Sequence, residues 1–197
     1  MQLNIYVIVH PIIQRLASEV IYNCDKSHIK KIYKKNIKKL EMLILYESIR
    51  KSIKGQNMYV KQIDSFKEKY LLDNRKKYLI VANLITACNI ISEVNSLMPE
   101  KDIKYIDSRQ ILAKDSSKKS ITDYLRTKNY INYRIIIFEK FLNKHIIIKI
   151  LDYFTNKTLI KIEQVQVACI VCNNRIIKQI GRKYSNLRIY TTKIREH

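Results

Sequence analysis

The chain has 197 residues, of which 47% are apolar, and its 38 basic and 17 acidic side chains give a formal net charge of +21. This apolar content suffices for one buried core, so we expect a single domain over residues 1–197. No stretch reaches the roughly 18 to 20 uncharged apolar residues of a membrane-spanning helix, which excludes that class of membrane protein.

The excess of lysine has two explanations. Lys, Asn, Ile and Tyr, whose codons are rich in A and T, are abundant, whereas Gly and Pro number 2 each and Trp is absent. An A/T-rich genome, such as that of an organelle or a reduced parasite, would therefore raise the lysine content without selection for a polyanionic partner. The charge also favours weak, non-specific attraction to nucleic acid at low salt. We favour the compositional explanation.

Residues 1–77 are predicted to form an N-terminal arm and a basic helix. The first 13 residues are apolar but lack the basic region and cleavage site of a signal peptide, and the Ser- and Arg-rich character of a transit peptide. Residues 25–52 show helical spacing, with lysines opposite an apolar stripe, which fits either a nucleic-acid-binding helix or, as we favour, a solvated face over a packed one. In residues 53–63, side chains alternate in character around Gly55, which predicts a short hairpin or arm. The polar residues 62–77 that follow are expected to be helical.

Residues 78–197 are predicted to form an α/β core. Short apolar runs alternate with amphipathic segments, which indicates parallel strands joined by right-handed helical crossovers. The predicted fold class is therefore α/β, a doubly wound and mostly parallel sheet with N-terminal helical additions. Residues 108–129 are polar and could be a mobile flap or a short inserted helix. The expected strands are 78–82, 103–107, 134–138, 164–171 and 187–192, and the expected helices are 86–97, 146–154 and 175–183.

The cysteines predict no metal site. Cys169 and Cys172 form one C-x-x-C, and the second pair that a zinc ribbon needs is missing. On a strand, residues three apart point to opposite faces unless a turn intervenes, so the two thiols should not chelate a metal. We expect them to be buried and reduced.

The junction between the strand at 134–138 and the following helix contains no glycine. Turns of this kind usually bind phosphate on backbone N–H groups, which needs the close approach and positive φ that glycine allows. The whole chain has only Gly55 and Gly181. The turn instead carries Asn143, Lys144, His145 and Ile146.

Several fragments resemble the uracil phosphoribosyltransferase family in order and spacing. These are HP at 10–11, LILYE at 43–47 and IYTTKI at 189–194, with ANLITACNII and IIFEKFLNKHIII where that family has its two main active-site loops. The resemblance covers nearly the full chain. It implies a type I phosphoribosyltransferase fold, synthesis of UMP from uracil and phosphoribosyl pyrophosphate (PRPP) with Mg²⁺, and assembly as a homodimer or larger.

The loop that binds PRPP in the family has changed. The family sequence is similar to Asp-Pro-Met-Leu-Ala-Thr-Gly-Gly-Ser, whose acidic side chains meet the ribose hydroxyls and whose Thr-Gly-Gly backbone surrounds the 5′-phosphate. The resemblance makes Glu139, which keeps a carboxylate, the candidate catalytic residue, while branched Ile146 and Ile147 replace small residues. Lys144 and His145 could hold a phosphate by charge, or could face solvent.

The loop that faces the pyrophosphate has changed as well. It resembles Pro-Ile-Leu-Arg-Ala-Gly in the family, but here Thr86 replaces the arginine and Cys88 the glycine. Loss of that cation would cost roughly 3 kcal/mol of transition-state stabilisation. By its position in this loop, the resemblance makes Thr86 a candidate for PRPP binding, together with Lys144, His145 and Arg109. Arg109 stands where the family has an arginine before its flap and is a second candidate, although an exposed arginine after a strand fits equally well. The base-recognition segment that follows the last strand in the family has no counterpart before His197, and Arg195 occupies the place of a family carboxylate.

Together these changes predict a homologue that has lost PRPP and uracil binding and whose present role is unknown. The alternatives are a surviving phosphoribosyltransferase with a site rebuilt from Glu139, Lys144 and Arg109, or a basic module that binds RNA or a partner protein. A homodimer is expected, and pairing with an active paralogue is a further option. The residue usage favours the plastid stroma of an alga, with the cytoplasm as the alternative.

Overall fold

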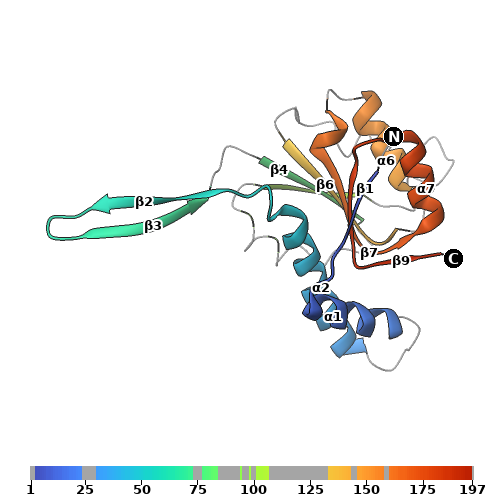
Figure 1. Cartoon of the computed structure of the whole chain (residues 1–197), viewed down its shortest axis with the longest axis horizontal. Helices are drawn as coiled ribbons and strands as arrows, with labels where there is room; N and C mark the ends of the chain where they lie inside the picture. Colours follow the sequence, from blue (N-terminus) through green and yellow to red (C-terminus); the bar gives the residue numbers. More distant parts are fainter. Residues whose placement is uncertain are drawn as a thin grey trace.

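A seven-stranded sheet organises the molecule in the computed structural model (Figure 1). The structure describes residues 3–23, 30–72, 77–83, 94, 98, 101–106, 133–142, 146–157 and 160–196. Six strands follow the order β1-β8-β7-β6-β4-β5, β9 continues the line of β8 along β7, and all pairings are parallel. The strands are β1 (Asn4–Val7), β4 (Lys77–Asn83), β5 (Lys101–Ile106), β6 (Tyr133–Leu142), β7 (Val165–Asn173), β8 (Arg188–Thr191) and β9 (Lys193–Arg195).

Helices cover both faces of this sheet, so the predicted doubly wound α/β class is confirmed. One buried cluster joins α1 (Pro11–Tyr22) and α2 (Lys30–Ile49) to the sheet. The other joins α6 (Ile146–Lys157) and α7 (Asn174–Lys183) to the opposite face (Figure 1). A short 3₁₀ turn, η1 (Ile162–Gln164), leads into β7.

The continuous apolar strands arise because both faces are buried. In β4, Leu79 and Val81 belong to the cluster under α6 and α7. Tyr78 and Ile80 alternate with them and belong to the cluster under α1 and α2. A strand covered on one face only would carry polar residues at every second position, which this one does not.

Helix α2 has the buried apolar stripe and the exposed basic face that its spacing predicted. Ile37, Leu40 and Ile44 on its apolar stripe are buried. Lys34 and Lys35 on the other face are exposed. The lysines therefore remain hydrated while the stripe packs on the sheet.

The N-terminal segment contributes more to the sheet than the sequence predicted. Strand β1 pairs with β8 along four residues, from Asn4 opposite Arg188 to Val7 opposite Thr191. The sequence did not predict β1, because a run of four residues is too short to show the alternation of side chains that marks a strand. Helix α1 follows with Pro11 at its first position, where a missing N–H costs no hydrogen bond.

The predicted arm is a two-stranded antiparallel hairpin of β2 (Gly55–Lys61) and β3 (Phe66–Leu72) that projects from the domain (Figure 1). The helix expected over residues 62–77 was therefore wrong within 66–72. Each residue of β3 lies opposite one of β2, and alternate pairs exchange backbone hydrogen bonds across the antiparallel ladder. A Cβ on Gly55 would lie 2.5 Å from atoms of the Tyr70 ring, so the absence of a side chain lets this ring cover the strand.

Two expected elements lie largely outside the described residues. Of the helix expected at 86–97 and its flank, only Val94 and Met98 are described; both are buried, and the Met98 N–H donates to the Val94 carbonyl at 3.1 Å. The polar segment 108–129 is not described. Among the described helices, none combines the length and the apolar character needed to cross a bilayer.

Two neighbouring isoleucines of α1 test the packing of this helix on the sheet. Ile13 is 2% exposed and Ile12 is 56% exposed. We expect Ile13→Ala to lower the free energy of unfolding by about 2 to 5 kcal/mol, because it leaves a cavity. Ile12→Ala should stay within about 0.5 kcal/mol of the wild type. Urea denaturation followed by circular dichroism measures both, and equal effects would contradict the packing of α1.

Candidate functional site

The carboxyl ends of β4 and β6 form the crevice where this fold places ligands. From β4 the chain continues to β5 on one side, and from β6 it continues to β7 and β8 on the other. The connections after β4 and β6 thus diverge, which creates the topological switch point at which open parallel sheets bind ligands. The two loops that the sequence singled out begin here.

Two polar side chains meet in this crevice. Asn83, the last residue of β4, is buried, and its Nδ2 donates a hydrogen bond to Oε1 of the half-buried Glu139 at 3.2 Å. The structure thus brings the carboxylate predicted from the first loop next to the residue that opens the second loop. A carboxylate oriented by an amide can accept hydrogen bonds from hydroxyl groups.

The remaining described walls of the crevice are apolar and close together. They come from β4, β5, β6 and the first two turns of α6, and include Ile106, Ile137, Ile146 and Ile150. The cavity between them measures about 10 Å³. That volume accommodates about one water molecule.

The start of α6 is occupied by packed side chains. Ile146 and Ile147 are 3% and 2% exposed and belong to the core cluster on the α6 and α7 side of the sheet. Strand β6 also continues through Leu142, four residues beyond its expected end, so Glu139 lies in a strand instead of a turn. The candidates Thr86, Arg109, Lys144 and His145 lie outside the described residues.

A buried ion pair on the other face of β6 was missed by the sequence analysis. Lys140, which follows Glu139 on β6, places its Nζ 3.3 Å from Oε1 of Glu41 on α2. Glu41 is fully buried, and this burial raises its pKa to about 7, although the charge and hydrogen bond of Lys140 act to lower it. The available signal was an acidic residue within the apolar stripe of an otherwise basic helix.

The cysteines of β7 are buried and reduced, as expected, but they share a face of the sheet. The Sγ atoms of Cys169 and Cys172 lie 3.0 Å apart. Between them, Ile170 and Val171 both pack on the α1 and α2 side, so the strand does not alternate regularly here. The expectation of opposite faces was therefore wrong. Burial raises the pKa of the Cys169 thiol, which keeps it protonated, and the described residues contain no cluster suited to a metal ion.

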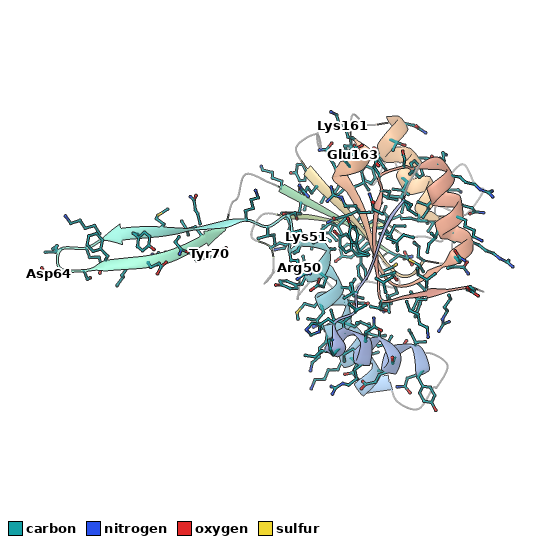
Figure 2. The ribbon with its side chains drawn as sticks, in the orientation of Figure 1. Arg50, Lys51, Asp64, Tyr70, Lys161 and Glu163 are labelled. Atoms are coloured by element: carbon teal, nitrogen blue, oxygen red, sulfur yellow. The ribbon has the colours of Figure 1, made fainter. Side chains whose placement is uncertain are left out.

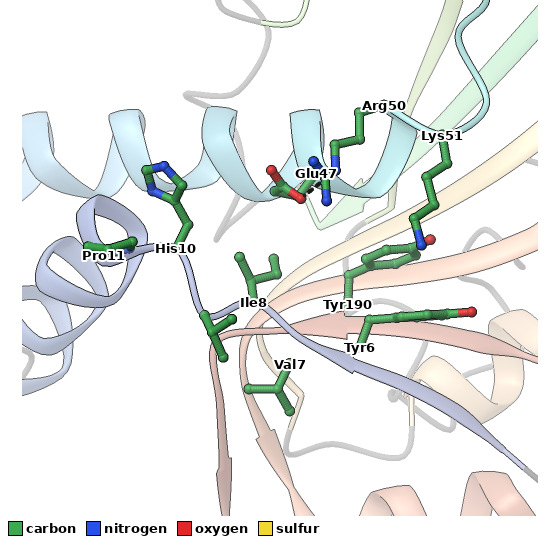
Figure 3. Close-up of a pocket in the computed structure, with 10 residues that line it drawn as sticks. Tyr6, Val7, Ile8, His10, Pro11, Glu47, Arg50, Lys51 and Tyr190 are labelled. Carbon is green, nitrogen blue, oxygen red and sulfur yellow. Dashed lines mark ion pairs between the residues drawn. The ribbon is translucent and has the colours of Figure 1, made fainter.

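A second and larger cleft lies between β1 and the end of α2, with a volume of about 450 Å³ (Figure 3). It is lined by residues 6–11, by Glu47, Arg50 and Lys51 of α2 and the turn after it, and by Tyr190 of β8. The rings of Tyr6 and Tyr190 stack at 4.9 Å between centroids, and Lys51 Nζ lies 5.3 Å from the Tyr6 ring centroid. Arg50 Nε lies 2.8 Å from Glu47 Oε2. The cleft thus has an apolar and aromatic floor with a mainly cationic rim.

Comparisons with known proteins agree with the resemblance noted in the sequence. The chain is 25% identical over 194 residues to proteins from Porphyra purpurea and Pyropia yezoensis, which covers 98% of this chain and 89% of each relative. The AQ2163 protein from Aquifex aeolicus overlays with a TM-score of 0.68 at 16% identity, over 96% of this chain and 86% of that one. The hypoxanthine phosphoribosyltransferase of Trypanosoma cruzi aligns with a TM-score of 0.41 at 10% identity, over 96% and 82% of the two chains. No family model matches the chain.

The sheet and its switch-point crevice define a doubly wound, parallel α/β fold, which the AQ2163 protein shares. Both algal relatives are named uracil phosphoribosyltransferase homolog. The chain is a homologue of these red algal proteins, and the expected relationship is confirmed.

The Glu41 and Lys140 pair predicts how stability depends on pH. The carboxyl has a pKa of about 7 in the folded protein, against an ordinary value of 4.5. Between these values the folded state holds the proton more tightly than the unfolded state, so this group's contribution to stability falls as the pH rises. We expect the stability of the wild type relative to Glu41→Gln to fall by about 3 kcal/mol between pH 4.5 and 7. Denaturant titrations across this range measure it.

The matched control is Glu163→Gln, because Glu163 is exposed in η1. Its stability should follow that of the wild type at every pH. A constant difference between wild type and Glu41→Gln would contradict a raised pKa at Glu41.

Proposed function

We propose that this chain is a uracil phosphoribosyltransferase homologue that no longer binds PRPP or uracil. The observation that carries the proposal is the packing at the start of α6, where Ile146 and Ile147 are buried in the core. The resemblance places the 5′-phosphate of PRPP at this turn.

Phosphate binding at a helix start needs exposed backbone N–H groups and space for the anion. The branched side chains of Ile146 and Ile147 pack in the core beside this helix start, so they crowd the space that an anion would need. The described walls of the crevice also leave only about 10 Å³ beside Glu139. A ribose with a phosphate and a pyrophosphate would have to displace several core side chains to enter.

The second candidate function is an active phosphoribosyltransferase with a rebuilt site. The contact between Asn83 and Glu139 favours it, because a carboxylate is kept at the switch point and oriented there. In such an enzyme, residues such as Arg109, Lys144 or His145 would have to supply the positive charges that bind the phosphates. It would use Mg²⁺ with PRPP.

We also propose that the protein forms a homodimer. The resemblance implies this assembly, and the projecting arm supports it. Met58, Tyr59 and Tyr70 of the arm are 42%, 65% and 66% exposed. An isolated two-stranded hairpin is at best marginally stable in water, so these side chains favour a protein contact.

Titration with PRPP tests the proposed loss of binding. We expect no saturable heat when PRPP and Mg²⁺ are added to the purified protein in a calorimeter at moderate salt. Pyrophosphate with Mg²⁺ is the control, because a chain of net charge +21 attracts any polyanion weakly at low salt. Heat that is equal for both anions and disappears with salt reports this general attraction.

One-to-one binding of PRPP that persists with salt would contradict the proposal, as would UMP formation from uracil. In that case Glu139→Gln should abolish turnover, since this residue is the candidate carboxylate at the crevice. Unchanged turnover would remove Glu139 from the second candidate function.

We propose the plastid stroma as the compartment. The A/T-rich residue usage and the red algal relatives support this location. Immunoblotting of fractionated cells should find the protein with stromal markers. Its recovery with cytosolic markers alone would contradict the proposal.

A further inference from the structure

The stacked tyrosines of the larger cleft direct their hydroxyl groups to the same side of the stack (Figure 3). Tyr190 is buried and Tyr6 is 38% exposed, and both line the cleft. Burial raises the pKa of Tyr190, although the positive charges of Arg188 and Arg134 act to lower it. The Tyr190 hydroxyl is therefore protonated at neutral pH and can donate a hydrogen bond to an anion.

Unpaired cations lie around this tyrosine pair. Arg188 is two residues before Tyr190 on β8, so both side chains lie on the α1 and α2 face of the sheet. Arg134 is two residues before Ile136 on β6 and lies on the same face. Lys51 completes the group, with its Nζ 5.3 Å from the Tyr6 ring centroid. None of these three cations forms an ion pair with an acidic side chain in the described part of the chain.

A buried amide lies on the same face of the sheet. Gln166 of β7 is opposite Arg188 in the register of the two strands. Its neighbours Val165 and Val167 belong to the cluster on the α6 and α7 face, so its side chain lies on the other face with the tyrosines. Gln166 is 4% exposed, and its Nε2 has no hydrogen-bond acceptor among the described residues. Buried N–H groups of this kind are rare, and an anion bound beside Arg188 would supply an acceptor.

The cleft next to these polar groups is mainly apolar. Val7, Ile8 and Pro11 are among the residues that line it. Arg50 on its rim is already paired with Glu47, so it adds no free charge. The volume of about 450 Å³ falls within the range of sites that bury whole ligands, roughly 300 to 1,000 Å³. An apolar space with cations and hydroxyls at one side suits a ligand that has an apolar body and a single anionic group.

We propose that the cleft binds a small amphipathic carboxylate, which is a free organic acid with an aliphatic or aromatic body. The body lies on the apolar floor, and the carboxylate is held by Lys51, Arg188 and the Tyr190 hydroxyl. A guanidinium group matches a carboxylate in a bidentate arrangement, which makes such hydrogen bonds strong. The cleft shares no residue with the crevice beside Glu139, so this site is independent of the proposed loss of PRPP binding.

Calorimetry with phenylacetate and the purified full chain tests the class of ligand. We expect saturable one-to-one binding that persists at moderate salt, where the general attraction of a basic chain for anions is screened. Phenylacetamide has the same body without the charge, and it should bind at least about tenfold more weakly because the charge-assisted hydrogen bonds are lost.

Three results of this titration would overturn the proposal. One is the absence of saturable phenylacetate binding, and another is equal affinity for phenylacetate and phenylacetamide. The third is inorganic phosphate binding as tightly as phenylacetate, because the apolar body would then contribute nothing.

Two pairs of variants test the cations. Arg188→Gln should weaken phenylacetate binding about tenfold, whereas Arg182→Gln, on the exposed side of α7, should not change it. Lys51→Gln should weaken binding only about threefold, because Lys51 is exposed to water. Its control is Lys161→Gln, since Lys161 is exposed and lies away from Lys51 at the base of the arm (Figure 2). Circular dichroism checks that each variant is folded, and equal affinities within both pairs would overturn the site.

Nuclear magnetic resonance locates the bound acid. On titration with phenylacetate, the backbone amide signals of Tyr6 and Tyr190 should shift, while that of Glu139 in the crevice should not. Shifts at Glu139 without shifts at Tyr6 would overturn the cleft as the site. That outcome would leave the PRPP titration as a separate test of the proposed function.

Discussion

The structure depends on the burial of a parallel sheet between two layers of helices. Strands β6 and β7 at its centre have no solvent face, and residues such as Ile136 and Val167 are fully buried on opposite sides. Each layer of helices supplies an apolar stripe, and the sheet holds the two stripes apart. The charges of this basic protein are therefore carried mainly on the outer helix faces, the arm and the loops, where they remain hydrated.

The burial of the sheet between two helix layers also explains why the crevice is apolar and small. An anion site at a helix start needs polar space, whereas a core gains stability from every methyl group it excludes from water. At the start of α6, Ile146 and Ile147 belong to the isoleucine core, at the turn where we propose that phosphate binding has been lost. Glu139 remains at the edge of this core with Asn83 as its hydrogen-bond donor, while Lys140 on the opposite side of β6 is drawn to Glu41. Neighbouring residues of one strand thus contact different layers of the molecule.

The sequence predicted those elements whose burial leaves a clear pattern. The runs that became β4, β6 and β7 are continuous and apolar because both faces are covered, and α2 shows its stripe and its lysines. The hairpin strand β3 was missed because both of its faces meet solvent, so no alternation marks it. The strand β1 is too short to be recognised, and the shared face of Cys169 and Cys172 depends on a local irregularity of β7.

The candidate site was predictable in part. The carboxylate at Glu139 followed from the order of the motifs, whereas its position at the switch point is seen only in the strand order of the folded sheet. Its contact with Asn83, and that of Glu41 with Lys140, join residues far apart in the chain. Spacing along the sequence cannot reveal such pairs, because they form only when the sheet assembles. The cleft likewise combines residues of β1, α2 and β8.

The pairing of β1 with β8 imposes an order on biosynthesis. Val7 lies opposite Thr191, so β1 cannot pair with β8 until residues 188–191 have left the ribosome. Contacts of such sequence separation close late, because the intervening chain must be ordered first. Tyr6 cannot stack on Tyr190 before that moment. The cleft therefore forms only after β8 has been made, and a copy that ends before Tyr190 does not present it.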